Sequence, residues 1–403
     1  MRLKVFYPNY SSGRAISHIC LSLCEAMRGE GMDVDVTMPA SDAAGRREFT
    51  RDAVPSWIKR LVYRLDRSER RVRDFAARRY LAGLERGDVA YVWPGAPLWV
   101  YEEIKRRGQV LVMERINTHQ ATAKRILDAE FRRLGMPSTH GITDEAVELE
   151  RRALALADLV FSPSPLVEES LVEHGVARDR VIASSYGWDP SRIDAHARAS
   201  LRPIDGLTVV FAGRVCVRKG PHLLLEAWAA SGVKGRVVFA GKVDQDVAER
   251  NAAFLARADV TCLSYVSDIG GVYRSADVFA FPTLEEGSPL VTYEAMACGL
   301  PVVVSPMGAG GVAREGKDGL IIDGHEREAW AGALRRLAAD AELRRGMGES
   351  ARIRAQGFTW SEVGARRRRA LLEALARLAA PHAGSNGAAP LGGGDGQRVA
   401  GLV

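Results

Sequence analysis

Residues 278–304 read VFAFPTLEEGSPLVTYEAMACGLPVVV, and this stretch contains the pattern that decides the fold. A short apolar run over 278–281 is followed by a polar loop, a helical pattern over 290–297 and a second apolar run over 301–305. An apolar strand, a helix and another apolar strand form the repeating unit of a parallel sheet, whose strands are buried on both faces. The stretch therefore predicts an α/β fold.

The same alternation extends over most of the chain in both directions. Strand-like runs occur in the first half at 3–7, 33–38, 89–93, 110–114, 159–162 and 181–185, and in the second half at 208–212, 236–240, 260–263, 278–281, 301–305 and 319–322. Helical patterns separate them, and a polar connection over 191–205 interrupts the series. This organisation predicts two Rossmann-like, doubly wound domains, at 1–200 and 201–357. A helix over 358–380 follows, and the Gly/Ala-rich segment 381–403 is expected to be a disordered tail.

Composition excludes several classes of protein. The 403 residues are 47% hydrophobic and 26% charged, which is ordinary for a globular protein and excludes wholesale disorder. Five cysteines without a CxxC pair argue against a disulfide scaffold or a zinc ribbon. No run approaches the roughly 18 apolar residues of a spanning helix, and residues 1–8 lack the apolar core of a signal peptide. We therefore expect a cytoplasmic protein.

The positive charge is concentrated in one segment. Residues 46–79 contain 12 Lys/Arg and 5 Asp/Glu, a net charge of +7, whereas the whole chain carries +6. Apolar residues recur at helical spacing within 57–84, with Trp57 and Tyr63 beside them. Such a helix can lie on an anionic membrane, or it can bury its apolar side and merely solvate its arginines. Both interpretations remain open, and no nucleic-acid-binding signature accompanies the segment.

The loop after the strand 278–281 carries the candidate chemistry. Glu286 lies in this loop at the carboxyl end of the strand, and Glu294 lies inside the following helix. Ser288 is expected to cap that helix, with Pro289 at its first position. Ligands of open α/β sheets bind at this edge, and a helix N-terminus favours an anion. The alternative is an ordinary helix start whose acidic residues favour the dipole.

A second cluster follows the strand 208–212. Arg214 and Lys219 stand between this strand and the next helix, in the segment GRVCVRKG (213–220). A fixed pair of cations there could neutralise a diphosphate, because charge-assisted contacts to phosphate are strong. Arg218, between them, is interpreted as a solvated charge.

These motifs resemble glycosyltransferase family 4. The Glu286-x7-Glu294 block matches its Glu-x7-Glu region almost position for position, and 213–220 resembles its Gly-Arg-x4-Lys-Gly segment. The likeness covers roughly residues 1–375 and is specific over 207–325. It implies the GT-B architecture, in which two domains face each other across a cleft and the C-terminal helix crosses back to the first domain.

The resemblance also implies the roles of particular residues. The catalytic residues would be Glu286, His119, Arg214 and Lys219. The donor-binding residues would be Gly13, Arg214, Lys219, Val266, Glu286, Gly287, Ser288, Leu290 and Glu294. A lone histidine such as His119 is more often structural, and that alternative stays open. No metal and no cofactor are expected.

The sequence departs from the family pattern in two loops. Only Gly13 remains of the paired glycines that usually follow the first strand, and Arg14 beside it is either a phosphate contact or a surface charge. The usual Gly-Phe-Gly after the first glutamate is Gly287-Ser288-Pro289. These changes alter the loops while retaining the acidic and basic residues.

The resemblance implies a retaining, metal-independent glycosyltransferase that uses a nucleotide-diphosphate sugar. Its acceptor would be a glycan or a lipid-linked precursor, reached from the inner face of an anionic membrane through residues 46–80. The alternatives are another GT-B enzyme, namely a nucleotide-sugar epimerase or a phosphorylase, and a non-catalytic nucleotide-sugar or membrane-binding scaffold. Nucleic acid is not expected as a partner.

Overall fold

Two parallel β-sheets organise the protein. A computed structural model describes residues 1–66, 69–193, 199–264 and 266–380; the tail expected to be disordered, 381–403, lies outside these residues. The first sheet has seven strands in the order β3-β2-β1-β4-β5-β6-β7, and the second has six in the order β10-β9-β8-β11-β12-β13. Both orders are doubly wound, as the alternating pattern predicts.

The strands of the first sheet lie close to the ranges expected from the sequence. They are β1 Arg2–Phe6, β2 Asp33–Met38, β3 Thr50–Asp52, β4 Val89–Val92, β5 Val110–Glu114, β6 Leu159–Ser162 and β7 Val181–Ala183. The strands of the second sheet are β8 Leu207–Ala212, β9 Gly235–Ala240, β10 Val260–Leu263, β11 Val278–Phe281, β12 Val302–Val304 and β13 Gly319–Ile321. The short edge strand β3 was not expected, because TRD carries no strand-like pattern.

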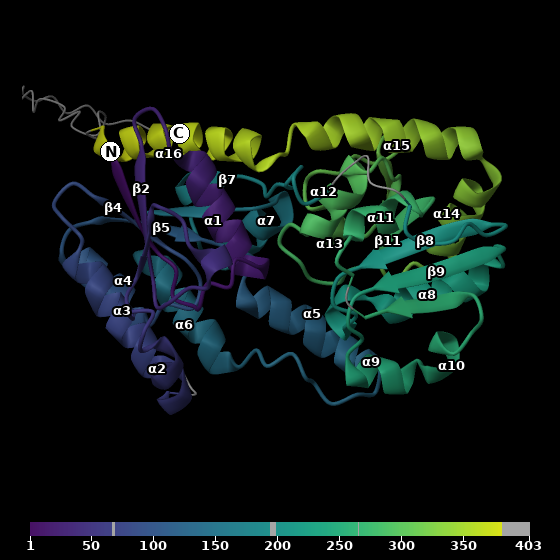
Figure 1. The fold of residues 1–403 in the computed structure, drawn as a ribbon, viewed down its shortest axis with the longest axis horizontal. Helices are drawn as coiled ribbons and strands as arrows, with labels where there is room; N and C mark the ends of the chain where they lie inside the picture. The colour runs from purple at the N-terminus through teal and green to yellow at the C-terminus, as the bar shows by residue number, and fades with distance from the viewer. Residues whose placement is uncertain (67–68, 194–198, 265, 381–403) are drawn as a thin grey trace, which may run out of the picture.

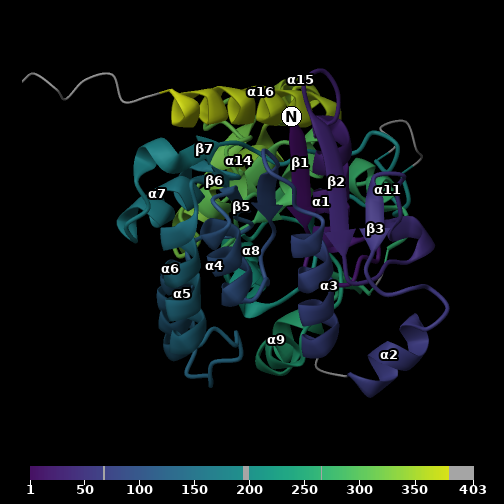
Figure 2. The same ribbon diagram turned by 90° about the vertical axis from the view of Figure 1, so that its left-hand side faces the viewer.

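Helices cover both faces of each sheet (Figures 1 and 2). Those of the first half are α1 Ala15–Met27, α2 Lys59–Leu65, α3 Arg70–Ala82, α4 Leu98–Arg106, α5 Gln120–Arg133, α6 Asp144–Leu156 and α7 Pro165–Glu173. Those of the second half are α8 Pro221–Ser231, α9 Gln245–Arg250, α10 Ala252–Leu255, α11 Ile269–Arg274, α12 Leu290–Ala297, α13 Pro306–Ala309, α14 Arg327–Ala339, α15 Ala341–Gln356 and α16 Trp360–Ala379. In the described part of the chain, none of them is long and apolar enough to cross a membrane.

The last helix returns to the first half of the molecule, as expected. In Figure 1 α15 and α16 run along one side of both sheets, and α16 lies over α1 and β7. Gly364 permits this close packing, because a Cβ there would stand 2.3 Å from the Cβ of Ala26. Arg367 projects from α16 into the first core, where it forms an ion pair with Glu114 at the end of β5.

The basic segment is not one continuous helix. It forms α2 and α3, and Glu69 between them has a left-handed backbone with φ 57°. The first helix therefore ends at Leu65, and the second begins at Arg70. Figure 2 shows α2 standing apart from the other helices, whereas α3 packs against the body of the first half.

Candidate functional site

The two motifs identified in the sequence meet at one edge of the second sheet. Strands β8 and β11 are hydrogen-bonded neighbours, so the loops after them lie side by side. The backbone N–H of Leu284 donates to the carbonyl of Arg218 at 2.9 Å. Gly220 allows this approach, because its φ is +67° and a Cβ there would stand 2.1 Å from the carbonyl oxygen of Pro282. The short helix η3, Val217–Lys219, is thus fixed against the loop that carries Glu286.

Glu286 lies between two cations. Its Oε1 is 3.4 Å from Nζ of Lys219 and 3.2 Å from Nη1 of Arg218. Burial by itself would lower the pKa of Arg218, but the carboxylates of Glu286 and Glu285 outweigh it and raise that pKa above its usual value. Arg218 is therefore an integral part of the site. The interpretation of this residue as a solvated charge is wrong, because its guanidinium is paired with Glu285 and Glu286.

Arg214 takes a different position from Lys219. Its side chain is 71% exposed and its Nε donates to Oδ1 of Asp244 at 2.7 Å, whereas the Lys219 side chain is only 14% exposed. The two cations expected to act as a pair thus have separate carboxylate partners. Their role toward a diphosphate stays a prediction.

The start of α12 differs from the expected capping pattern. The helix begins at Leu290 with Pro289 as its N-cap, and the Ser288 side chain does not cap it. The Ser288 hydroxyl instead donates to the carbonyl of Gly310 at 3.1 Å and lies 2.6 Å from the hydroxyl of Tyr293. The expectation of a Ser288 cap is wrong, because this hydroxyl is buried beside a carbonyl that needs a donor.

Glu294, the second glutamate of the motif, lies on α12, which follows the loop of Glu286. Its Oε2 accepts a hydrogen bond from the hydroxyl of Tyr273 at 3.2 Å. Burial raises the pKa of Glu294, and the nearby Arg192 partly opposes this shift. Val266 is half-buried and packs against the second core, whereas Leu290 packs against the first. Their contacts with a donor stay predictions.

Gly13 and His119 come from the first half of the molecule. Gly13 occupies a left-handed turn with φ +69°, and a Cβ there would stand 2.3 Å from the carbonyl oxygen of Ala44. His119 is 2% exposed, and its Nδ1 accepts from the backbone N–H of Ala121 at the start of α5. Its ring stacks on His174 with centroids 4.2 Å apart. Burial lowers the pKa of His119 to about 4, so the ring is neutral at pH 7.

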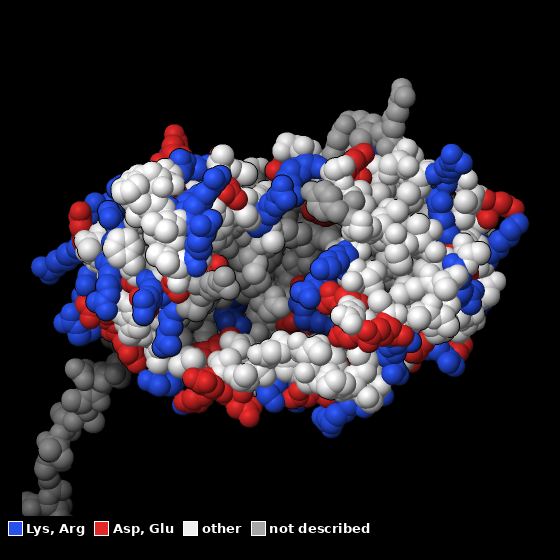
Figure 3. Space-filling view, turned by 60° about the horizontal axis from the view of Figure 1, so that its bottom comes forward, with Lys and Arg blue, Asp and Glu red and all other residues white. Residues whose placement is uncertain are grey.

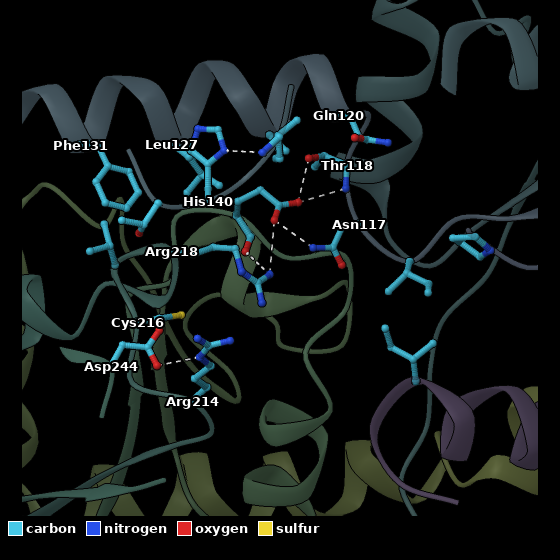
Figure 4. A pocket seen from close by; sticks show the side chains of 18 of the residues that line it. Asn117, Thr118, Gln120, Leu127, Phe131, His140, Arg214, Cys216, Arg218 and Asp244 are labelled. Atoms are coloured by element: carbon cyan, nitrogen blue, oxygen red, sulfur yellow. Dashed lines mark hydrogen bonds and ion pairs between the residues drawn. The ribbon is translucent and has the colours of Figure 1, made fainter. Parts of the chain in front are cut away.

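A cavity of about 470 Å³ lies between the two halves, next to this edge. Arg115, Thr118 and Gln120 line it from the first half, and Arg214 and Arg218 from the second (Figure 4). His119, Lys219, Glu286 and Glu294 do not belong to its lining. Arg214 is thus the one predicted catalytic residue that the structure brings into the cavity wall.

A second cavity of about 760 Å³ lies within the first half, bordered by α3, α4 and α6. Pro94, Arg115, Gln120 and Glu150 line both cavities, so the two adjoin. Arg115 and Glu150 form an ion pair at 2.6 Å where the two cavities adjoin, and their side chains are only 8% and 4% exposed. The hollow between the two halves is visible in Figure 3.

Sequence reasoning missed three residues that join the two halves. Glu285 is 1% exposed and accepts hydrogen bonds from Asn117 and Thr118, which come from the loop after β5. Figure 4 shows Asn117 and Thr118 on one wall of the cavity and Arg218 on the other. The acidic pair Glu285-Glu286 was a visible signal, but its partners lie 167 and 168 residues away.

The basic segment exposes apolar side chains on α2 and just before it. Trp57, Leu61 and Leu65 are 84%, 57% and 78% exposed. On α3, by contrast, Val72 and Tyr80 are each 3% exposed. The apolar stripe of α3 is thus mostly buried, although Phe75 is 46% exposed. The stripe of α2 is divided, since Val62 and Tyr63 pack against a small core whereas Leu61 and Leu65 are exposed. Figure 3 shows Lys and Arg side chains gathered on the lobe that holds this segment.

Within the ranges that the structure describes, no group of three or more His, Cys, Asp or Glu side chains could hold a metal ion. The carboxylates nearest the candidate site are instead paired with Arg218, Lys219 and Arg214.

The segment that carries both motifs is similar to known glycosyltransferases. Residues 206–340 match the family model described as "Glycosyl transferases group 1". A curated D-inositol 3-phosphate glycosyltransferase from Saccharomonospora viridis is 33% identical over 234 residues, which cover 52% of this chain and 54% of that protein. One of the same name from Actinosynnema mirum is 31% identical over 279 residues, covering 57% of this chain and 65% of that protein. The resemblance to glycosyltransferase family 4 is confirmed.

The chain spans about half the length of the first of these curated relatives. Solved structures match more of the fold. Sucrose-phosphate synthase from Thermosynechococcus elongatus superposes with a TM-score of 0.68 at 20% identity, over 93% of this chain and 99% of that one. HepE from Anabaena, solved with UDP, superposes with a TM-score of 0.64 at 16% identity, over 93% of this chain and 100% of that one. These likenesses confirm the GT-B fold.

Proposed function

We propose that this protein, whose residues 206–340 match the group 1 glycosyltransferase model, is a retaining glycosyltransferase that moves a sugar from a nucleotide-diphosphate sugar to an acceptor. The observation that carries this proposal is the meeting of Lys219, Arg218 and Glu286 where β8 and β11 end, beside a cavity shared by both halves. Cations held at this edge can stabilise the charge of a departing diphosphate.

The proposed roles are those that the resemblance to glycosyltransferase family 4 implies. Lys219 and Arg214 bind the diphosphate, Glu286 holds the sugar near C1, and Glu294 holds the ribose. Gly13 gives the loop after β1 a close approach to the diphosphate, and His119 contributes from the opposite domain. Val266, Gly287, Ser288 and Leu290 complete the donor site.

The proposed transfer forms a bond between the acceptor oxygen and C1 while the bond between C1 and the phosphate oxygen breaks. The departing phosphate oxygen takes the acceptor proton on the same face, which retains the anomeric configuration. No metal is needed, because the guanidinium and ammonium groups supply the positive charge.

A panel of nucleotide sugars tests the proposal. Thermal shift of the purified full chain identifies the preferred donor, and mass spectrometry then detects the glycosylated acceptor. D-inositol 3-phosphate is a first acceptor to include, since the curated relatives carry that name. Release of nucleotide diphosphate together with a glycosylated product supports transfer. If the protein binds donors but converts none of them, the non-catalytic scaffold is supported instead. If it changes the sugar of the donor in the absence of any acceptor, it is an epimerase.

We further propose that the protein is cytoplasmic and meets a lipid-linked acceptor on the inner face of an anionic membrane. Support comes from α2 and the residues just before it, where exposed Trp57, Leu61 and Leu65 stand among basic residues. Tryptophan is enriched at the membrane interface, and each Lys or Arg near an acidic bilayer contributes about 1 kcal/mol. An apolar patch combined with positive charge matches an anionic bilayer better than a soluble partner.

Vesicle co-sedimentation tests this surface. Wild-type protein should bind vesicles containing phosphatidylglycerol at low salt and dissociate as salt rises. Replacing Trp57, Leu61 and Leu65 together by Ser should abolish binding, and Arg60→Glu with Arg64→Glu should weaken it. Leu149→Ser is a control, because Leu149 is exposed on α6. Binding that persists in the triple variant would contradict the proposal.

A further inference from the structure

We propose that Glu285 is a positioning residue that fixes the first-domain loop 116–118 against the loop of Glu286, and so sets the closed arrangement needed for sugar transfer. This inference rests on the proposed function above. Glu285 lies directly before the Glu286-x7-Glu294 motif and is not part of it.

Both oxygens of the Glu285 carboxylate are occupied. Oε1 accepts from the backbone N–H of Thr118 at 3.2 Å and from its hydroxyl at 2.9 Å. Oε2 accepts from Nδ2 of Asn117 at 2.9 Å and from Nη1 of Arg218 at 3.3 Å. Three of these donors belong to the first domain and one to the second. A carboxylate with this many protein donors is built to hold the two loops and leaves little capacity for substrate.

Burial makes these donors necessary. Glu285 is 1% exposed, and burial raises its pKa, while Arg218, Thr118 and Asn117 oppose that shift. A buried carboxylate is costly unless it is paired and hydrogen-bonded. Separation of the domains would remove three of its four donors, so its hydrogen bonds are complete in the closed arrangement.

The backbone confirms how closely the two loops approach. A Cβ on Gly287 would stand 1.6 Å from the carbonyl oxygen of Ile116, so no other residue fits there without displacing the first domain. Leu290 and Ile116 both pack against the core of the first half. Contacts at 285, 287 and 290 therefore bracket Glu286 on both sides.

The consequence for catalysis is geometric. Glu286 lies between Glu285 and Gly287 and shares Arg218 with Glu285. Thr118 lines the cavity between the domains and directly precedes His119. The contact fixes the position of the first-domain loop, on the acceptor side of the cleft, relative to Glu286. A small displacement of reacting groups reduces turnover strongly. Binding of the nucleotide, which uses the second domain, depends less on this contact.

The test compares Glu285→Ala, Glu285→Gln and Thr118→Val in the full chain. The control is Glu349→Gln, which changes a glutamate that pairs with Arg352 on the surface of α15. Amide hydrogen exchange of a peptide covering 115–121 should accelerate at least tenfold in Glu285→Ala and remain unchanged in the control. Kinetics should show a fall in kcat of at least tenfold, with the affinity for UDP, used as the probe, changed less than threefold.

A double variant separates positioning from general destabilisation. Glu285→Gln combined with Thr118→Val should lose less than the sum of the single effects on kcat, because both remove the same contact. These two variants also serve if Glu285→Ala does not fold. Unchanged exchange over 115–121, or faster exchange with unaltered kcat, would overturn the proposal. If the wild-type protein transfers no sugar, the proposed function fails, and the exchange data still decide whether Glu285 closes the domains.

Discussion

Glu130 on α5 accepts a hydrogen bond from Nε2 of His222 on α8 at 2.6 Å, across the boundary between the two domains. Each side chain is only 2% exposed. Nε2 of His325 and Nη2 of Arg133 reach the same carboxylate at 2.8 and 2.7 Å. The next residue of α5, Phe131, packs into the core of the second domain. The C-terminal end of α5 thus joins the domains at a second place, apart from Glu285.

This cluster predicts a loss of stability in acid. Hydrogen bonds from His222, Arg133 and His325 outweigh burial and lower the pKa of Glu130 below its usual 4.5. A carboxyl with a lowered folded-state pKa stabilises the fold above its unfolded pKa, and that contribution is lost as pH falls further. The free energy of unfolding should therefore decline below about pH 4.5, and less steeply in Glu130→Gln. Denaturant unfolding at several pH values measures both, and equal acid slopes would contradict the prediction.

Glu130→Ala should cost about 1–3 kcal/mol at pH 7, because it leaves the buried ring of His222 without its acceptor and removes the ion partner of Arg133. Glu148→Ala is a matched control, since Glu148 pairs with Arg151 on the surface of α6. A cost no larger than that of the control would show that the interdomain bond contributes little.

Lys219→Ala should weaken nucleotide-diphosphate binding more than Arg214→Ala. Removing a charge-assisted contact costs roughly 1.5–3 kcal/mol, and Lys219 is the less exposed of the two, whereas Arg214 is largely solvated and paired with Asp244. Isothermal titration with UDP measures the difference. If the affinity for UDP is unchanged in both variants, neither Lys219 nor Arg214 binds the diphosphate.

Glu286→Gln should reduce kcat strongly, whereas Glu294→Gln should mainly raise the KM for the donor. Glu286 is held beside Lys219 and Arg218 at the strand ends, whereas Glu294 lies further along α12 against Tyr273. Steady-state kinetics with a saturating acceptor separates the two effects. If Glu286→Gln mainly raised the KM and Glu294→Gln mainly lowered kcat, the roles assigned to the two glutamates would have to be exchanged.

Arg367→Leu should destabilise the chain by about 3–5 kcal/mol, because it leaves the carboxylate of Glu114 buried without its cation. Both side chains are at most 1% exposed, and Arg367 also lies over the ring of Phe161 at 4.0 Å. Arg369→Leu, on an exposed position of the same helix, is the control. Thermal unfolding of both variants compares them. Equal midpoints would mean that α16 is held by its apolar contacts alone.

Sugar transfer should continue in excess EDTA, because Arg214, Arg218 and Lys219 provide the positive charge expected at the diphosphate. The assay is the acceptor-dependent transfer described above, repeated with and without chelator. Abolition by EDTA and recovery with magnesium or manganese would assign the leaving-group role to a metal ion.

The alternating pattern of the sequence predicted the two doubly wound sheets, and the family resemblance implied the returning helix. Continuous apolar runs such as 208–212 and 278–281 are buried on both faces, and this burial depends on local pattern alone. It also indicated that the Arg214–Gly220 and Glu286–Glu294 segments belong to one edge, since both follow strands of the same sheet. Local pattern was less informative at Ser288, whose hydroxyl bonds to Gly310.

Only the tertiary structure decided which charged residues act together. Arg218 and Glu285 look like surface residues in the sequence, but they pair with each other, and Glu285 also accepts from Asn117 and Thr118 of the other domain. Tertiary packing likewise separated α3, whose apolar stripe is mostly buried, from α2, whose Leu61 and Leu65 are exposed, although both have helical spacing. Helical periodicity shows that one face is apolar, whereas the position of the helix in the fold determines what covers that face.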